Sequence, residues 1–121
     1  MTTLRILVVD DSSLTTERIS TIIETMGHEV VRVCHTGREA IDAYRELQPD
    51  MVTMDITMPD MDGVQATRLI IESFPDAKII MVTSHGQQKM VLAAIDAGAK
   101  GYILKPVKPD KLMSTIAGLG G

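Results

Sequence analysis

Apolar residues along the chain follow two alternating patterns. Short runs rich in β-branched residues occur at 6–9, 30–33, 51–54, 79–82 and 101–104, and such runs are typical of strands. The first, third and fourth runs are apolar at nearly every position, as strands buried on both faces are. The other two runs are shorter or more mixed, which favours the edges of a sheet.

Segments with helical periodicity separate these runs. They are expected from residue 14 to 26, from 36 to before Pro49, from 62 to before Pro75, from 87 to 97, and from Pro109 onward. In the first segment the apolar residues fall roughly on one face, which predicts that this face packs on the sheet: Leu14, Ile19, Ile22, Ile23 and Met26.

Local signals mark the ends of several helices. Thr36 and Glu39 match a capping box, in which the hydroxyl accepts from an amide and the carboxylate reaches back. Asp62, three residues before Gln65, opens the third helix in the same way. The last helix is expected to dissolve in its glycines, as a frayed end or the start of a linker: Gly118, Gly120 and Gly121.

Five strands alternating with five helices predict an α/β fold, with a five-stranded parallel sheet and helices on both faces. The chain of 121 residues has the usual size of one domain, so we expect a single domain over residues 1–121. No internal linker, repeat or low-complexity segment interrupts the pattern.

Composition narrows the function. The chain has 16 acidic and 12 basic residues, a net charge of −4, and three aromatic rings, which disfavours direct nucleic-acid binding. Its one cysteine, Cys34, excludes an intramolecular disulfide and is expected to be a small buried residue. No apolar run is long enough for a membrane span and no signal-peptide pattern opens the chain, so we expect a cytoplasmic protein without membrane insertion. His28 and His35 flank the second strand and are expected at the surface.

The residues that follow the strands carry the candidate chemistry. Parallel sheets bind ligands beyond the carboxyl ends of their strands. Asp10 and Asp11 follow the first strand, Asp55 the third, Thr83 the fourth and Lys105 the fifth. If the first and third strands are neighbours, three carboxylates crowd one rim beside a hydroxyl and an ammonium.

Such a cluster predicts a divalent-cation site. Carboxylates at close range repel one another unless a cation neutralises them, and Mg²⁺ prefers oxygen ligands. Together with Lys105 and Thr83, the cluster suits phosphoryl transfer, in which an aspartate can be the nucleophile. Each residue alone is also explained as a helix cap or a loop polar group. The combination at one edge favours the site.

Four segments resemble the receiver domains of two-component response regulators: Val8–Ser12, Met54–Gly63, Val82–Ser84 and Leu104–Pro106. The resemblance runs from Arg5 to about Ala117, and the layout is most similar to the stand-alone, CheY-like receivers of chemotaxis. It implies a flavodoxin-like (βα)₅ sandwich with strand order 2-1-3-4-5.

The resemblance also implies roles at the acidic rim. Asp55 would accept a phosphoryl group from a phosphohistidine of a sensor kinase. Asp11 and Asp55 would bind Mg²⁺ directly, Asp10 largely through water, and Thr57 through its backbone carbonyl. Thr57 and His85 occupy positions where the family varies and where the side chain affects loss of the phosphate.

Further implied roles concern signalling. Lys105 would hold a phosphate oxygen, Thr83 would turn towards the phosphate, and Tyr102 would move into the space that Thr83 leaves. The responding surface would consist of the fourth helix, the fifth strand and the fifth helix. The implied protein is a monomer and a signalling switch rather than an enzyme, although it assists its own phosphorylation and dephosphorylation. Its partners would be a CheA-like histidine kinase and a downstream target such as a flagellar switch or a phosphatase.

Three functions stay open on sequence alone. The chain is a free-standing switch in chemotaxis or motility, or the N-terminal receiver of a longer regulator with a DNA-binding or enzymatic output domain. It can also be a phosphate sink or relay intermediate. Other phosphate chemistries fit poorly, because no phosphate-binding glycine loop follows a strand, and haloacid-dehalogenase phosphatases require a second aspartate where Thr57 stands.

Overall fold

The computed structural model describes residues 3–120. Strands and helices alternate throughout: β1 (Arg5–Val9), α1 (Ser13–Thr25), β2 (Glu29–Cys34), α2 (Gly37–Leu47), β3 (Met51–Met54), α3 (Gly63–Ser73), β4 (Ile79–Thr83), α4 (Gln88–Asp96), β5 (Gly101–Leu104) and α5 (Pro109–Gly120). The expected order of elements is confirmed. No helix within the described residues is both long and apolar enough to cross a bilayer.

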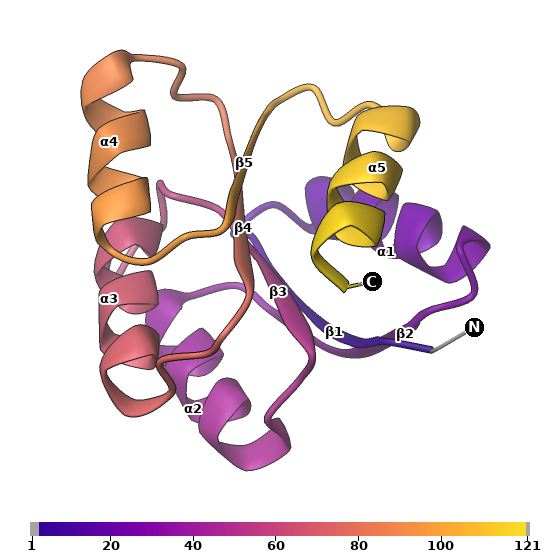
Figure 1. The fold of residues 1–121 in the computed structure, drawn as a ribbon, viewed down its shortest axis with the longest axis horizontal. Coiled ribbons are helices and arrows are strands. Elements are labelled where there is room, and N and C mark those ends of the chain that lie inside the picture. The colour runs from indigo at the N-terminus through magenta and orange to yellow at the C-terminus, as the bar shows by residue number, and fades with distance from the viewer. Residues whose placement is uncertain (1–2, 121) are drawn as a thin grey trace.

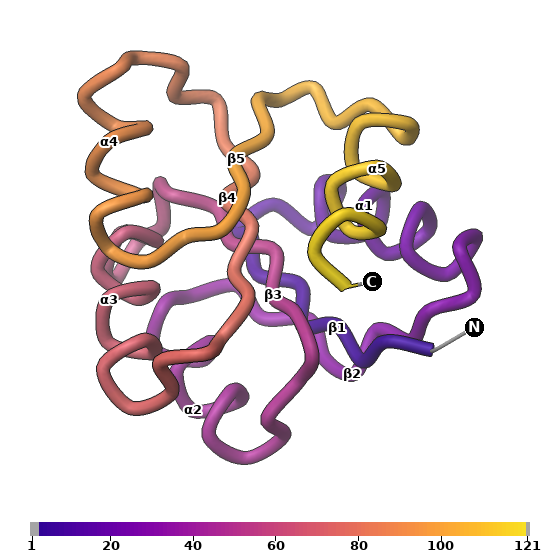
Figure 2. Tube along the Cα trace, viewed as in Figure 1, coloured from indigo at the N-terminus to yellow at the C-terminus, as the bar shows by residue number. Residues whose placement is uncertain are grey.

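All five strands form one parallel sheet in the order β2-β1-β3-β4-β5. This confirms the flavodoxin-like fold class and places the two mixed strands at the edges. Helices α1 and α5 cover one face of the sheet, and α2, α3 and α4 cover the other (Figure 1). The tube in Figure 2 shows α5 lying beside α1. At the end of α5, Gly120 packs beside Leu4, which precedes β1.

Each face of the sheet carries its own apolar core. Leu7 and Val9 of β1 belong to the core under α2, α3 and α4, whereas Ile6 and Val8 belong to the core under α1 and α5. All four side chains are at most 2% exposed. A strand that feeds two cores must be apolar at every position, which explains the unbroken apolar run in the sequence.

Helix α2 begins with a variant of the expected capping box. The Thr36 hydroxyl accepts from the Glu39 N–H at 3.1 Å, as expected. The Glu39 carboxylate, however, accepts from the N–H of His35 at 2.8 Å rather than from that of Thr36. The cap of α3 is confirmed, because Asp62 accepts from the N–H of Gln65 at 2.8 Å.

Leu14 does not join the core face of α1. Its side chain is 79% exposed, and Thr16 is buried instead. Leu14 and Ile19 are five positions apart, so their side chains project about 140° apart around the helix axis. Leu14 therefore lies over the segment that contains Pro106, not over the sheet.

The glycines at the C-terminus do not end α5 early. The helix continues through Gly118 to Gly120, and Gly121 lies outside the described residues. Lys78 donates to the carbonyl of Leu119 at 2.9 Å, which satisfies one of the last helical acceptors. A Cβ at Gly120 would come within 2.4 Å of Leu4, so this position accepts no side chain without a shift.

The buried hydroxyl of Thr53 generates a prediction about stability. Within residues 3–120 its Oγ1 has no hydrogen-bond partner, although Thr53 is completely buried in the central strand β3. We expect Thr53→Val to stabilise the fold by about 1 kcal/mol, because valine has the same shape without the unpaired hydroxyl. Urea denaturation measures the change.

Thr67→Val is the matched control. Thr67 is equally buried, but its hydroxyl donates to the sulfur of Met81 at 3.6 Å. We expect this variant to be neutral or slightly destabilised. Equal stabilisation by both substitutions would show that the unpaired hydroxyl is not the cause.

Candidate functional site

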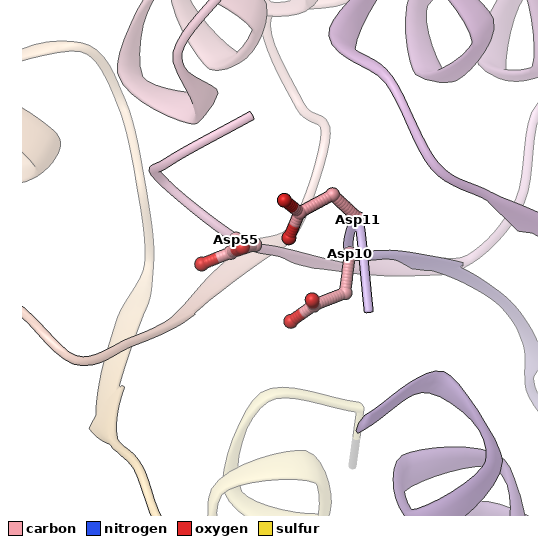
Figure 3. Close-up of side chains that lie close together, drawn as sticks. All are labelled: Asp10, Asp11 and Asp55. Carbon is pink, nitrogen blue, oxygen red and sulfur yellow. The ribbon is translucent and has the colours of Figure 1, made fainter. Parts of the chain in front are cut away.

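The register of β1 and β3 places two aspartates next to each other. Val9 pairs with Met54, so both strands end at the same level. Asp10 and Asp55 are the next residues, and the N–H of Asp55 donates to the carbonyl of Val9 at 3.0 Å. Asp11 follows at the same rim (Figure 3).

The three carboxylates converge. One oxygen from each of Asp10, Asp11 and Asp55 lies within 4.8 Å of the others, and Figure 3 shows the three side chains close together where β1 and β3 end. Asp10 and Asp55 are buried, whereas Asp11 is exposed. The cluster is therefore open to solvent on the side of Asp11 and enclosed on the side of Asp10.

Lys105, the residue that follows β5, faces this cluster. Its backbone N–H donates to the carbonyl of Thr83 at 2.8 Å, which fixes the point where the side chain leaves the sheet. Its Nζ lies 2.8 Å from Oδ2 of Asp10 and 3.5 Å from Oδ1 of Asp55. Burial opposes the charged ammonium, but its ion pair with Asp10 and the charge of Asp55 outweigh the burial and raise the pKa of Lys105.

Asp55 is held in an unfavourable electrostatic position. Burial raises its pKa to about 6, the Asp10 carboxylate adds to the rise, and the Lys105 ammonium opposes it. The N–H of Ile56, 2.9 Å from Oδ1, also favours the ionised form. Asp55 is thus ionised at neutral pH, but at a cost that a nearby cation would remove.

The structure separates these acids from helix capping. Ser12, not Asp10 or Asp11, is the N-cap of α1, and its hydroxyl accepts from the N–H of Thr15 at 3.3 Å. Asp10 accepts from the N–H of Ser12 through one oxygen, while its other oxygen meets Lys105. A role in stabilising the loop therefore explains one oxygen of Asp10 but not the other, which faces Lys105.

A hard divalent cation fits this set of groups. All three donors are carboxylates, which Mg²⁺ prefers, and two of them are buried with a net excess of negative charge beside one ammonium. The exposed Asp11 leaves room for water ligands, which Mg²⁺ usually retains. Zinc fits less well because no histidine or cysteine joins the cluster among the described residues.

Thr83 and Tyr102 are linked through His85. The Thr83 hydroxyl, fully buried, accepts from the N–H of His85 at 3.2 Å. The Tyr102 hydroxyl donates to the carbonyl of the same residue. The imidazole of His85 in turn lies 2.7 Å from the exposed hydroxyl of Thr57. His85 therefore connects the loop after β4 with the loop after β3 and with β5.

Sequence analysis missed an anchor of the loop after β3. Asp60 accepts from the N–H groups of Gly37 at 2.9 Å and Arg38 at 2.8 Å, the first two residues of α2. The hydrogen bond from Arg38, with that from Gly37, holds the pKa of Asp60 below its usual range. The loop that carries Asp55 and Thr57 is thus tied to a different helix.

Gly63 closes the same loop from its other end. Its N–H donates to the carbonyl of Ile56 at 2.7 Å. A Cβ at this position would lie 1.9 Å from the carbonyl oxygen of Asp55, so only glycine fits. The motif glycine therefore allows helix α3 to begin directly against the backbone of Asp55.

His35 also differs from the expectation of a surface polar residue. It is half-buried, and its Nδ1 lies 2.9 Å from the carbonyl of Asp10. Because a carbonyl can only accept, Nδ1 carries the proton in this contact. The residue that follows the edge strand β2 therefore helps to hold the loop after β1, through a contact between residues 25 positions apart. Cys34, in contrast, is a buried residue as expected.

The raised pKa of Asp55 predicts a pH-dependent gain in stability for Asp55→Asn in the presence of a chelator. Between the ordinary value of 3.8 and about 6 the folded state holds more protons at this site than the unfolded state, so wild-type stability falls as pH rises through that range. We expect the variant to be more stable than wild type at pH 8 by on the order of 1 kcal/mol, a figure reduced for partial solvation.

The gain should shrink as the pH falls below about 6 and vanish near the ordinary value of 3.8. Urea denaturation of both proteins at several pH values measures it. A difference that is constant across this range would show that the charge of Asp55 is not its source.

Known proteins resemble the chain over nearly its whole length. The sequence matches the response regulator receiver domain over residues 6–117. Chemotaxis protein CheY of Thermotoga maritima is 46% identical over 112 residues, with 93% of each chain covered. The corresponding protein of Bacillus subtilis is also 46% identical over 112 residues, again with 93% coverage of both.

Solved structures agree with these sequence relatives. A CheX–CheY complex with beryllofluoride and magnesium from Borrelia burgdorferi superposes with a TM-score of 0.94 at 31% identity, over 97% of this chain and 89% of that chain. A two-component response regulator of the LuxR family from Aurantimonas gives a TM-score of 0.92 at 37% identity, over 97% and 84% of the chains.

Fold, strand order and the family match agree with the resemblance that the strand-end motifs suggested. Mg²⁺ binding at an acidic pocket is typical of this family. The chain belongs to the response regulator receiver domain family and is CheY-like.

Proposed function

We propose that this chain is a phosphorylation-dependent signalling switch in which Asp55 is the phosphoacceptor. The observation that carries the proposal is the buried Asp55 carboxylate at the strand ends, 3.5 Å from the Lys105 ammonium and within the cluster of three acids. Asp11 is exposed and Asp10 already pairs with Lys105 at 2.8 Å. Asp55 is therefore the buried acid that lies near Lys105 without already forming its closest ion pair.

The reaction is a phosphoryl transfer. An Asp55 oxygen attacks phosphorus, the bond from phosphorus to the donor nitrogen of a phosphohistidine breaks, and the imidazole leaves with that electron pair and takes up a proton. The nucleophile must be ionised, which a pKa of about 6 provides at neutral pH. Lys105 is placed to neutralise an oxygen of the incoming group.

Asp10, Asp11 and Asp55, with the backbone carbonyl of Thr57, are the residues that would hold Mg²⁺. When bound, the ion neutralises charge on the phosphoryl oxygens during transfer. The chain's own contribution is the fixed geometry of these donors. Gly63 and Asp60 supply it by holding both ends of the loop between Asp55 and α3.

The switch depends on the hydroxyl of Thr83. Phosphorylation adds about 1.5 to 2 negative charges, and a hydroxyl that donates to the new oxygens must reorient. The Thr83 hydroxyl accepts from the N–H of His85, and the carbonyl of His85 accepts from Tyr102. A shift of Thr83 is therefore transmitted to the loop before α4 and to β5. Exposed apolar side chains lie on the responding surface: Leu92, Ile95 and Leu104.

A stand-alone role in chemotaxis is supported by the relatives named chemotaxis protein CheY, because the alignments cover nearly their whole length. The partners would be a CheA-like histidine kinase and a downstream target such as a flagellar switch or a phosphatase, and the protein would act as a monomer.

A second candidate, the receiver of a longer regulator, has support from a transcriptional regulatory protein of Bacillus subtilis. That protein is 40% identical, but the alignment covers only 56% of it. Whether the reading frame stops after Gly121 decides between the two.

Asp55→Asn is expected to abolish phosphorylation, because the amide is a poor nucleophile. Intact-mass measurement after incubation with acetyl phosphate and Mg²⁺ detects the added group. Asp96→Asn, a substitution at an exposed aspartate on α4, is the control and should retain wild-type labelling. Undiminished labelling of Asp55→Asn at the same site would reject Asp55 as the phosphoacceptor.

Asp11→Ala is expected to weaken Mg²⁺ binding about tenfold or more, the loss of roughly 1.4 kcal/mol or more of metal–carboxylate attraction. Calorimetric titration of Mg²⁺ into unphosphorylated protein measures the affinity. Asp42→Ala removes an equally exposed charge on α2 and controls for the change in net charge. Equal affinities of Asp11→Ala and wild type would remove Asp11 from the ligand set.

A further inference from the structure

The segment between β5 and α5 determines where Lys105 lies, yet part of it is weakly packed. Its first residue is tied to the sheet through the N–H of Lys105, and the side chain of Val107 is buried in the core under α1 and α5. Pro106, between them, is exposed. The side of the segment that faces α1 borders an open groove of about 370 Å³.

Arg18 of α1 spans this groove. Its Nε donates to the backbone carbonyl of Val107 at 2.9 Å and thereby joins residues 89 positions apart in the sequence. Among the hydrogen bonds of residues 3–120, this is the one that links an α1 side chain to the segment from Lys105 to Lys108. The bond reaches the chain two residues beyond Lys105.

The placement of the Lys105 ammonium is demanding. It lies between two carboxylates, 2.8 Å from Asp10 and 3.5 Å from Asp55, at the end of a flexible four-carbon stem. An outward movement of the segment would draw the stem away from both carboxylates. A bond from α1 to the carbonyl of Val107 opposes that movement.

We propose that Arg18 is a positioning residue for phosphoryl transfer: through the carbonyl of Val107 it holds the segment that keeps the Lys105 ammonium beside Asp55. Arg18 itself touches neither Asp55 nor the incoming group. This inference rests on the proposed function of Asp55 and Lys105.

The arrangement separates two binding events. The carboxylates proposed to hold Mg²⁺ follow β1 and β3, and none of them lies in the segment that Arg18 braces. Lys105 repels a divalent cation, whereas it attracts a phosphoryl group. Loss of the brace should therefore weaken the binding of a phosphoryl mimic without weakening the binding of Mg²⁺.

The test compares wild type with Arg18→Met, which keeps most of the apolar stem and removes the donor. We expect the affinity for beryllofluoride at saturating Mg²⁺ to fall about three- to tenfold, the usual effect of one hydrogen bond. Calorimetric Mg²⁺ affinity should be equal to or slightly higher than that of wild type. Circular dichroism and urea denaturation verify that the variant is folded.

Two controls remove the effect of charge. Arg68→Met deletes an exposed arginine on α3 that has no side-chain hydrogen bond or ion pair within the described residues, and it should bind beryllofluoride as wild type does. Arg18→Lys keeps the charge and a hydrogen-bond donor, and we expect it to bind beryllofluoride more tightly than Arg18→Met does. Titrations of all variants are repeated in about 1 M salt, where charges are screened beyond about 3 Å.

The outcomes are distinct. Weaker beryllofluoride binding by Arg18→Met, persisting in high salt with Mg²⁺ affinity intact, supports the proposal. A loss that disappears in high salt would assign Arg18 a general electrostatic effect and overturn the positioning role. Equal loss of Mg²⁺ affinity would show a general structural defect and overturn it as well. Absence of beryllofluoride binding by wild type would instead overturn the proposed function of the site.

Discussion

The in-register ending of β1 and β3 is the constraint on which the site depends. Because Val9 pairs with Met54, the chain must place Asp10 and Asp55 side by side at the rim, and it does so with both carboxylates buried. Two adjacent buried anions are unstable without compensation. Lys105, at the end of β5, supplies one compensating positive charge. The remaining negative charge favours a bound cation at the rim.

Several features of the fold were predictable from sequence because they rest on local rules. The unbroken apolar runs of β1, β3 and β4 reflect strands that face two cores, and the cap at Asp62 reflects short-range hydrogen bonding. The strand order came from a family resemblance, since pairing between strands is not a local property. The acids of the site were found because motifs at strand ends lie next to one another whenever their strands do.

The errors have equally physical causes. Leu14 was assigned to the core by its apolar character, although its angular position on α1 places it elsewhere. The last helix is predicted to dissolve in its terminal glycines, but tertiary contacts of Leu119 and Gly120 support the last turn. The bonds of Arg18, His35 and Asp60 join distant segments, and their side chains carry no sequence pattern that names a backbone partner.

The contact between Asp60 and the start of α2 limits how this protein can be recombined with its relatives. Helix α2 obtains part of its N-terminal cap from a loop about twenty residues further along the chain, and Met61 packs closely against Gly37 at the same place. A crossover point anywhere between these segments separates the helix from its cap. Chimeras that exchange α2 should therefore exchange residues 36–63 as one block, so that the helix keeps the loop that caps it.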